Sequence, residues 1–236
     1  VFQRALSRGV PPASLRLLGH PIHPKFDDVT GTVAELRAAL GLPADDMVVM
    51  LMAGGEGGGK LLSTTLALAR ARLPVHLVVV CGRNEHLQQK LAEMSASLPT
   101  PMQVLGFTDK IPEYFRAVDL LVTKAGPGTL AEANAAQLPV IVYDYVPGQE
   151  RGNLDFVRHN GLGEVAIGGA SQVVEAVRSM IRMPERLAAI RHNQEIVAPR
   201  RSSRRIAALI AQIANTGMIP PQELEPLEPL RQAAGV

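Results

Sequence analysis

Residues 123–132 read TKAGPGTLAE, and this stretch decides the expected fold. An apolar run at 120–122 comes directly before it, and Gly126 and Gly128 mark a turn within it. Pro127 suits the first position of a helix, so the pattern predicts a buried strand, a glycine turn and a helix start. Free backbone N–H groups and the positive end of the helix dipole would meet at this turn, which favours phosphate binding.

Glu132 lies one turn into the same predicted helix. A carboxylate repels a bare anion, so its expected partner is a neutral hydroxyl next to the phosphate. A sugar nucleotide supplies both groups, because its diphosphate adjoins a ribose. The simpler alternative is an exposed acid that stabilises the helix dipole by about 0.5 kcal/mol.

The order of strand, glycine turn and helix recurs on both sides of this stretch. Strands that alternate with helices of this length predict right-handed βαβ units and an α/β fold with a doubly wound parallel sheet. Ligands of such sheets bind outside the carboxyl ends of the strands. Apolar runs predict strands at 15–18, 47–52, 75–80, 102–105, 120–122 and 140–143. Helices are expected at 32–40, 85–97 and 153–160, with one that ends near 72, a short one that begins after 112 and two or three more from 171 on.

Composition narrows the class of protein. Of the 236 residues, 47% are apolar but only 3% are aromatic, so the core must be aliphatic, as in a parallel sheet. The net charge of +2 gives no indication of nucleic acid binding. The single Cys81 excludes a disulfide framework and fits a reducing compartment. No apolar run reaches the ~18 residues of a membrane span, and because the first residue is Val1, we expect a piece of a longer protein.

A second glycine turn, GGEGGGK at 54–60, follows the predicted strand 47–52. It matches the start of a P-loop, G-x-x-x-x-G-K, but Leu61 stands where that motif needs Ser or Thr to ligate Mg²⁺. A nucleotidase and a tight turn without a ligand are both alternatives. The favoured interpretation is that these glycines let the backbone approach a substrate.

A third polar cluster follows the predicted strand 140–143. Gln149 and Asn153 are four residues apart, so on a helix they would share a face and could hold sugar hydroxyls. The alternative is a polar helix start in which one of them is a cap. The chain has no D-x-D pair for a metal–diphosphate complex, so backbone N–H groups and the helix dipole are expected to carry the charge of a diphosphate.

These features together resemble the donor-binding half of a glycosyltransferase with two Rossmann-like domains, the GT-B fold. The chain is most similar to monogalactosyldiacylglycerol synthases and related diacylglycerol glycosyltransferases, which group with the N-acetylglucosaminyltransferase that makes lipid II. The resemblance runs from about residue 10 to 163. It rests on LMAGGEG at 51–57, CGRN at 81–84, GFTDK at 106–110, TKAGPGTLAEA at 123–133 and DYVPGQERGN at 144–153.

The resemblance implies a set of UDP-sugar-binding residues. The loop Gly126, Pro127, Gly128 and Thr129 would hold the diphosphate, and Glu132 would bind the ribose hydroxyls. Gln149 and Asn153 would contact the donor sugar. The segment from Phe107 and Thr108 to Ile111 would cradle uracil, largely through its backbone. Gly55, Glu56 and Gly57 would face the reacting centre and the phosphates.

The implied reaction is the inverting transfer of galactose or glucose from UDP to diacylglycerol, with no metal or other cofactor. The implied partners are UDP-galactose or UDP-glucose and the lipid acceptor, with no nucleic acid. The location would be cytoplasmic, peripheral on the inner face of the plasma membrane. This chain has His23 where the family usually has an arginine near the diphosphate.

In the family that the chain resembles, an amino-terminal domain binds the acceptor and supplies the catalytic base, and we expect this sequence to lack that domain. We therefore expect residues 1–214 to form a UDP-sugar-binding domain, residues 215–236 to form a tail or strap, and the fragment alone to be inactive. Besides the P-loop nucleotidase, the alternatives are a sugar-nucleotide epimerase of the same fold and a non-catalytic binding subunit.

Overall fold

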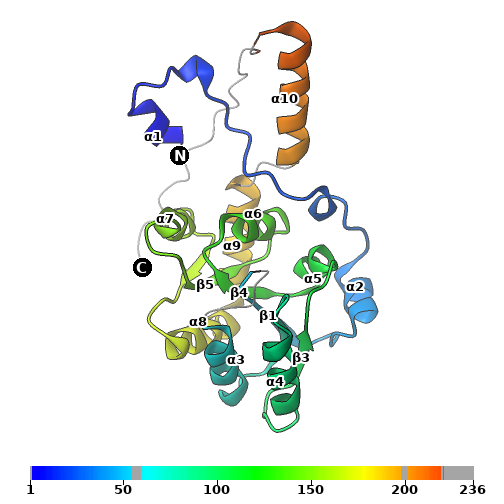
Figure 1. The fold of residues 1–236 in the computed structure, drawn as a ribbon. Coiled ribbons are helices and arrows are strands. Elements are labelled where there is room, and N and C mark those ends of the chain that lie inside the picture. The colour runs from blue at the N-terminus through cyan, green and yellow to red at the C-terminus, as the bar shows by residue number, and fades with distance from the viewer. Residues whose placement is uncertain (1, 55–59, 198–200, 219, 221–236) are drawn as a thin grey trace. The chain divides into compact units, whose positions relative to one another are not determined.

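The computed structural model describes residues 2–54, 60–197, 201–218 and 220. The chain divides into two compact units, residues 25–198 and residues 1–24 with 199–236. The first unit contains the whole sheet (Figure 1). The predicted division into 1–214 and 215–236 stays a prediction, since 221–236 lie outside the described residues.

The larger unit is built on one parallel sheet of six strands in the order β3-β2-β1-β4-β5-β6. All five strand pairings are parallel, which confirms the predicted doubly wound α/β fold. The strands are β1 (Met47–Met52), β2 (Val75–Val80), β3 (Met102–Leu105), β4 (Leu120–Lys124), β5 (Val140–Asp144) and β6 (Gly163–Val165).

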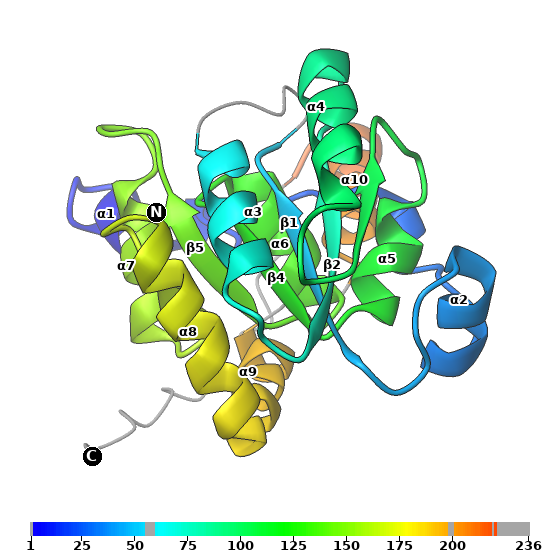
Figure 2. The same cartoon turned by 90° about the horizontal axis from the view of Figure 1, so that it is seen from below.

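Helices cover both faces of this sheet. Residues of α3, α4 and α8 join one hydrophobic cluster with alternate residues of the central strands, while α5 and α6 lie on the opposite face (Figures 1 and 2). The helices of this unit are α2 (Val33–Leu40), α3 (Leu61–Arg70), α4 (Glu85–Ser95), α5 (Ile111–Ala117), α6 (Pro127–Ala135), α7 (Arg151–His159), α8 (Ala170–Arg182) and α9 (Pro184–Val197).

The core is aliphatic, as the composition predicts. Residues 48–51 of β1 and 120–122 of β4 are completely buried, because helices cover both faces of the central strands. Among the described residues, Phe26 and Phe115 pack edge to face, with 5.6 Å between their ring centroids.

The second unit contains α1 (Phe2–Leu6) and α10 (Ser202–Thr216), with a short 3₁₀ turn at Pro12–Ser14. Ser202 Oγ donates a 2.6 Å hydrogen bond to His20 O and thereby joins its two segments. The strand predicted at 15–18 is wrong. These residues have no strand pairing, because the sheet lies in the other unit. No helix in the described ranges is both long and apolar enough to cross a membrane.

Candidate functional site

The order of the strands reverses between β1 and β4, which are hydrogen-bonded neighbours. The helix that follows β1 covers one face of the sheet and the helix that follows β4 covers the other. The carboxyl ends of these two strands therefore form the switch point of the sheet, which is where doubly wound sheets bind ligands. Both glycine turns predicted from the sequence follow these strands.

The start of α6 lies at this switch point and has no side-chain cap. Gly126 is the N-cap residue with φ −63° and ψ 128°, and Pro127 is the first helical residue, as predicted. The amides of Gly128 and Thr129 have no acceptor within the helix, since they belong to its first turn. Among the described residues, apart from the chain neighbours of Gly128 and the backbone of its own helix, no heavy atom lies within 4 Å of a Cβ built on Gly128.

Two hydrogen bonds fix the loop before α6. Ala125 N donates to Asp144 O at 2.9 Å, and Asn153 Nδ2 donates to Ala125 O at 2.8 Å. Asn153 thus uses its amide nitrogen on the protein, and its carbonyl oxygen has no hydrogen-bond partner among the described residues. Ala125 itself is completely buried. Asn153 therefore ties the start of α7 to the loop that leads into α6.

This bond gives a stability prediction. Asn153→Ala should lower the free energy of unfolding by about 1–3 kcal/mol, because the carbonyl of buried Ala125 loses its partner. Asn160→Ala is the matched control, since Asn160 Nδ2 also donates 2.8 Å to a backbone carbonyl, Phe156 O, but in an exposed bond. Urea unfolding should show a clearly smaller change for the control. Equal losses in both variants would contradict the bracing role of Asn153.

Glu132 is half-buried on α6, and burial raises the pKa of its carboxyl group. Within the part of the chain that the structure describes, this carboxylate has neither a hydrogen bond nor an ion pair. A desolvated carboxylate without a donor is costly to the fold. Glu132 is therefore able to accept hydrogen bonds from a ligand, and an exposed helix-dipole acid is the less fitting interpretation.

The polar turn after β5 differs from the expectation. Gln149 lies in a turn that precedes α7, and Asn153 is in the helix, so the prediction that they share one helical face is wrong. Glu150 Oε2 accepts a 2.7 Å hydrogen bond from Val146 N and so stabilises the non-helical turn. Gln149 itself is exposed, so it remains available to a ligand.

Glu150 is a neighbour of the α6 start that sequence reasoning missed. A Cβ built on Gly126 would lie 4.0 Å from both Glu150 Oε1 and Thr129 Oγ1, so this carboxylate and this hydroxyl border the glycine. Residues 126 and 150 are separated in the chain by α6, β5 and the turn after β5, so their proximity arises from the fold.

The predicted uracil segment lies in the loop from β3 to α5. The Phe107 side chain is 66% exposed, and the Arg83 guanidinium stands 5.1 Å from its ring centroid. Thr108 Oγ1 accepts a 3.2 Å hydrogen bond from Lys110 N, and Ile111 opens α5. An exposed ring held by a cation offers a surface for stacking a planar group. Sequence reasoning did not assign Arg83 to this place.

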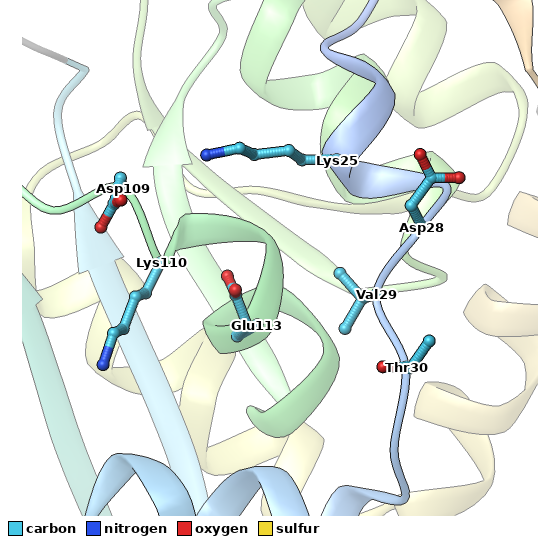
Figure 3. A pocket seen from close by; sticks show the side chains of 7 residues that line it. All are labelled: Lys25, Asp28, Val29, Thr30, Asp109, Lys110 and Glu113. Carbon is cyan, nitrogen blue, oxygen red and sulfur yellow. The ribbon is translucent and has the colours of Figure 1, made fainter.

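A cavity of about 380 Å³ adjoins this loop. The stretch Lys25–Thr30 borders it on one side, and the end of the loop with the first turns of α5 borders it on the other (Figure 3). None of its described lining residues belongs to α6. Its lining residues are Lys25, Asp28, Val29, Thr30, Asp109, Lys110 and Glu113.

The glycine turn after β1 is described only at its two ends. Gly55, Glu56 and Gly57 lie outside the described residues, so their predicted role stays a prediction. At the far end, Lys60 Nζ lies 3.3 Å from Asp144 Oδ1. Leu61, which stands where a P-loop needs a hydroxyl, is completely buried. In the described ranges, no three His, Cys, Asp or Glu side chains gather as a metal site.

Comparisons with known proteins identify the family of this chain. The profile of the glycosyltransferase family 28 C-terminal domain matches residues 54–205. A Glycine max protein named as a probable chloroplastic monogalactosyldiacylglycerol synthase is 42% identical over 171 residues, which are 70% of this chain and 32% of that protein. The chain thus spans about a third of the length of this curated relative.

Two solved structures show the same fold. WaaG, a glycosyltransferase involved in lipopolysaccharide biosynthesis, aligns with TM-score 0.62 and 19% identity over 88% of this chain and 58% of its own. The structure of S. aureus MnaA with UDP aligns with TM-score 0.67 and 16% identity, over 94% of this chain and 60% of the MnaA chain. The predicted GT-B C-terminal half and the family resemblance are confirmed. The chain belongs to glycosyltransferase family 28, whose C-terminal domain it contains.

Proposed function

We propose that this chain is the UDP-sugar-binding domain of an inverting, metal-independent glycosyltransferase that transfers galactose or glucose from UDP to diacylglycerol. The observation that carries the proposal is the pairing of an uncapped α6 start with the half-buried, unpartnered Glu132 one turn further on. These two features fit a diphosphate and a ribose, which are adjacent groups in a UDP-sugar. Family membership and the names of the relatives support the sugar transfer and the lipid acceptor.

Each predicted residue has a role in this proposal. The Gly128 and Thr129 amides donate to the diphosphate, with Gly126 and Pro127 shaping the turn, and Glu132 accepts from the ribose hydroxyls. Phe107 stacks on the uracil while Thr108 and Ile111 border it. Gln149 and the free carbonyl oxygen of Asn153 contact the hexose. Gly55, Glu56 and Gly57 keep their proposed place at the reacting centre.

The acceptor and the base belong to the remainder of the parent protein. The C1–O bond to UDP breaks as the glycerol hydroxyl attacks C1 from the opposite side, and its proton passes to a base on the amino-terminal domain. Because diacylglycerol resides in a bilayer, we propose peripheral membrane association, on the cytoplasmic side at the inner face of the plasma membrane. This chain alone is then a binding domain without turnover.

Calorimetric titration of the 236-residue chain tests the proposal. UDP, UDP-galactose, UDP-glucose and ATP would each be titrated in EDTA and again in Mg²⁺. We expect the three uridine compounds to bind equally well in both buffers and ATP to bind at least about tenfold more weakly, a difference near 1.4 kcal/mol. Binding of ATP that requires Mg²⁺, without binding of UDP, would instead establish the nucleotidase.

The epimerase alternative predicts the same titration but a different chemistry. An epimerase acts on its donor alone, so the full-length parent protein would convert a UDP-sugar to its epimer without lipid. The glycosyltransferase releases UDP at a useful rate only when diacylglycerol is present. An assay of the parent protein with and without diacylglycerol vesicles separates the two.

A further inference from the structure

The proposed function leaves Lys60 unexplained. This lysine ends the glycine turn after β1 and is the N-cap residue of α3. Its side chain is 54% exposed, and its only ion pair in the described ranges is the one with Asp144, at 3.3 Å from Nζ to Oδ1. Asp144 is 20% exposed and is the last residue of β5. The P-loop interpretation fails to account for Lys60, because the Leu61 side chain is in the core.

The ion pair joins the end of the β1 turn to the end of β5, the strands on either side of the strand that leads to α6. In the sheet, β4 lies between β1 and β5, so a bond from the end of the β1 turn to the end of β5 passes the end of β4. Asp144 O also accepts the 2.9 Å hydrogen bond from Ala125 N, directly before the start of α6. Lys60 therefore pairs with a residue, Asp144, that is itself hydrogen-bonded to the loop leading to Pro127.

The energetics permit the lysine to change partners. An ion pair between partly exposed side chains contributes only about 0–1 kcal/mol, so little is lost when it opens. A diphosphate carries more negative charge than a single carboxylate and is a stronger partner for an ammonium group. The flexible four-carbon stem of lysine allows Nζ to move between neighbouring anions without any backbone change.

We propose that Lys60 is a diphosphate-binding residue of the UDP-sugar site, and that Asp144 holds it in the empty protein and competes with the nucleotide for it. This inference rests on the proposed function, because it assumes that a diphosphate occupies the α6 start. In the complex, Lys60 leaves Asp144 and pairs with the diphosphate. The released UDP keeps this contact, so Lys60 strengthens the binding of product as well as donor.

Titrations with UDP and uridine test the inference on the 236-residue chain. Lys60→Met keeps the apolar stem and removes the charge, and it should weaken UDP binding roughly tenfold while leaving uridine binding unchanged. Asp144→Asn removes the competitor and should tighten UDP binding by a factor of about two to five at low salt. Lys90→Met, at an exposed site on α4, is the matched control and should alter neither ligand.

The outcomes separate this inference from the proposed function. Unchanged UDP affinity in Lys60→Met, with a clear loss in Glu132→Ala, would overturn the role of Lys60 alone. Equal losses for UDP and uridine in Lys60→Met would show that the residue acts through the fold and would likewise overturn it, as would weaker UDP binding in Asp144→Asn with unaltered thermal unfolding. Absence of UDP binding by the unmodified chain would remove both proposals.

Discussion

Replacement of Arg37 by methionine is expected to lower the free energy of unfolding by about 3–5 kcal/mol, the range for breaking a buried ion pair. Arg37 is only 6% exposed, and its Nη2 lies 2.7 Å from Asp119 Oδ2. The same guanidinium donates to four backbone carbonyls. These carbonyls belong to Ala117 (2.9 Å), Ala44 (2.8 Å), Asp46 (3.1 Å) and Pro43 (3.3 Å).

The loss is large because Arg37 joins segments distant in sequence. It connects α2 with the end of α5 and with the loop before β1, and Asp119 in turn accepts 2.8 Å from Val48 N at the start of β1. Methionine fills the volume but removes the guanidinium donor from the four carbonyls and the positive charge beside Asp119. Urea unfolding measures the change, with Arg70→Met at an exposed site on α3 as the control. A loss below about 1 kcal/mol would contradict the bracing role of Arg37.

Arg37 also separates stability from function. It lies at the amino-terminal ends of the central strands β1 and β4, whereas α6 starts at the carboxyl end of β4. The folded fraction of Arg37→Met should therefore bind UDP with unchanged affinity. A loss of affinity in protein that remains folded would show that the two ends of the strands are energetically coupled.

Glu132→Ala is expected to weaken UDP binding by about 1–3 kcal/mol, which is the cost of leaving hydrogen-bond partners unsatisfied. The reason is that the proposed acceptor of the ribose hydroxyls is lost, while the α6 start remains intact. Calorimetry with UDP measures the effect, and Glu85→Ala in the first turn of α4 is the control. Equal affinity in the two variants would remove Glu132 from the site.

Glu132→Gln should make the fold more stable at pH 7. Burial raises the pKa of Glu132, so the carboxyl contributes its full stability below its unfolded pKa and loses it as pH rises through the folded value. At pH 7 the ionised group destabilises the fold, and glutamine removes that cost. Glu132→Gln should therefore unfold at a higher temperature than the unmodified chain at pH 7, and the difference should shrink as the pH falls toward 4.

The sign of that change distinguishes two interpretations of Glu132. An exposed acid at a helix start stabilises the dipole, so its neutralisation would lower the stability at pH 7 by about 0.5 kcal/mol. Neutralisation of a desolvated acid would instead raise the stability at pH 7. Thermal unfolding of both proteins at pH 7 and pH 4 decides between them, with Glu85→Gln showing the behaviour of an exposed helix-start acid.

Local patterns were sufficient to predict the sheet and the start of α6. The apolar runs of β1, β2, β4 and β5 are buried on both faces, so their hydrophobicity is continuous and visible in the sequence. The turn to α6 was predictable because Pro127 and its flanking glycines carry their own conformational preferences. The family motifs fall in the same loops, because those loops lie at the carboxyl ends of the strands.

Features that depend on tertiary contacts were not predictable. β6 has only three residues and begins with Gly163, so it lacks an apolar run. The segment 15–18 has a strand-like pattern but no neighbouring strand to pair with. Glu150 accepts a hydrogen bond from Val146 N within the turn that contains Gln149. The five acceptors around Arg37 come from two segments distant from each other in the sequence, 43–46 and 117–119. No local pattern encodes such contacts.

The most direct test of the proposed site is a crystal structure of the 236-residue chain soaked with UDP. The proposal predicts phosphate oxygens within hydrogen-bond distance of the Gly128 and Thr129 amides, and ribose hydroxyls on the Glu132 carboxylate. Nucleotide bound at the amino-terminal ends of the strands, or at α6 with the Glu132 side chain turned away from the ribose, would contradict the proposal.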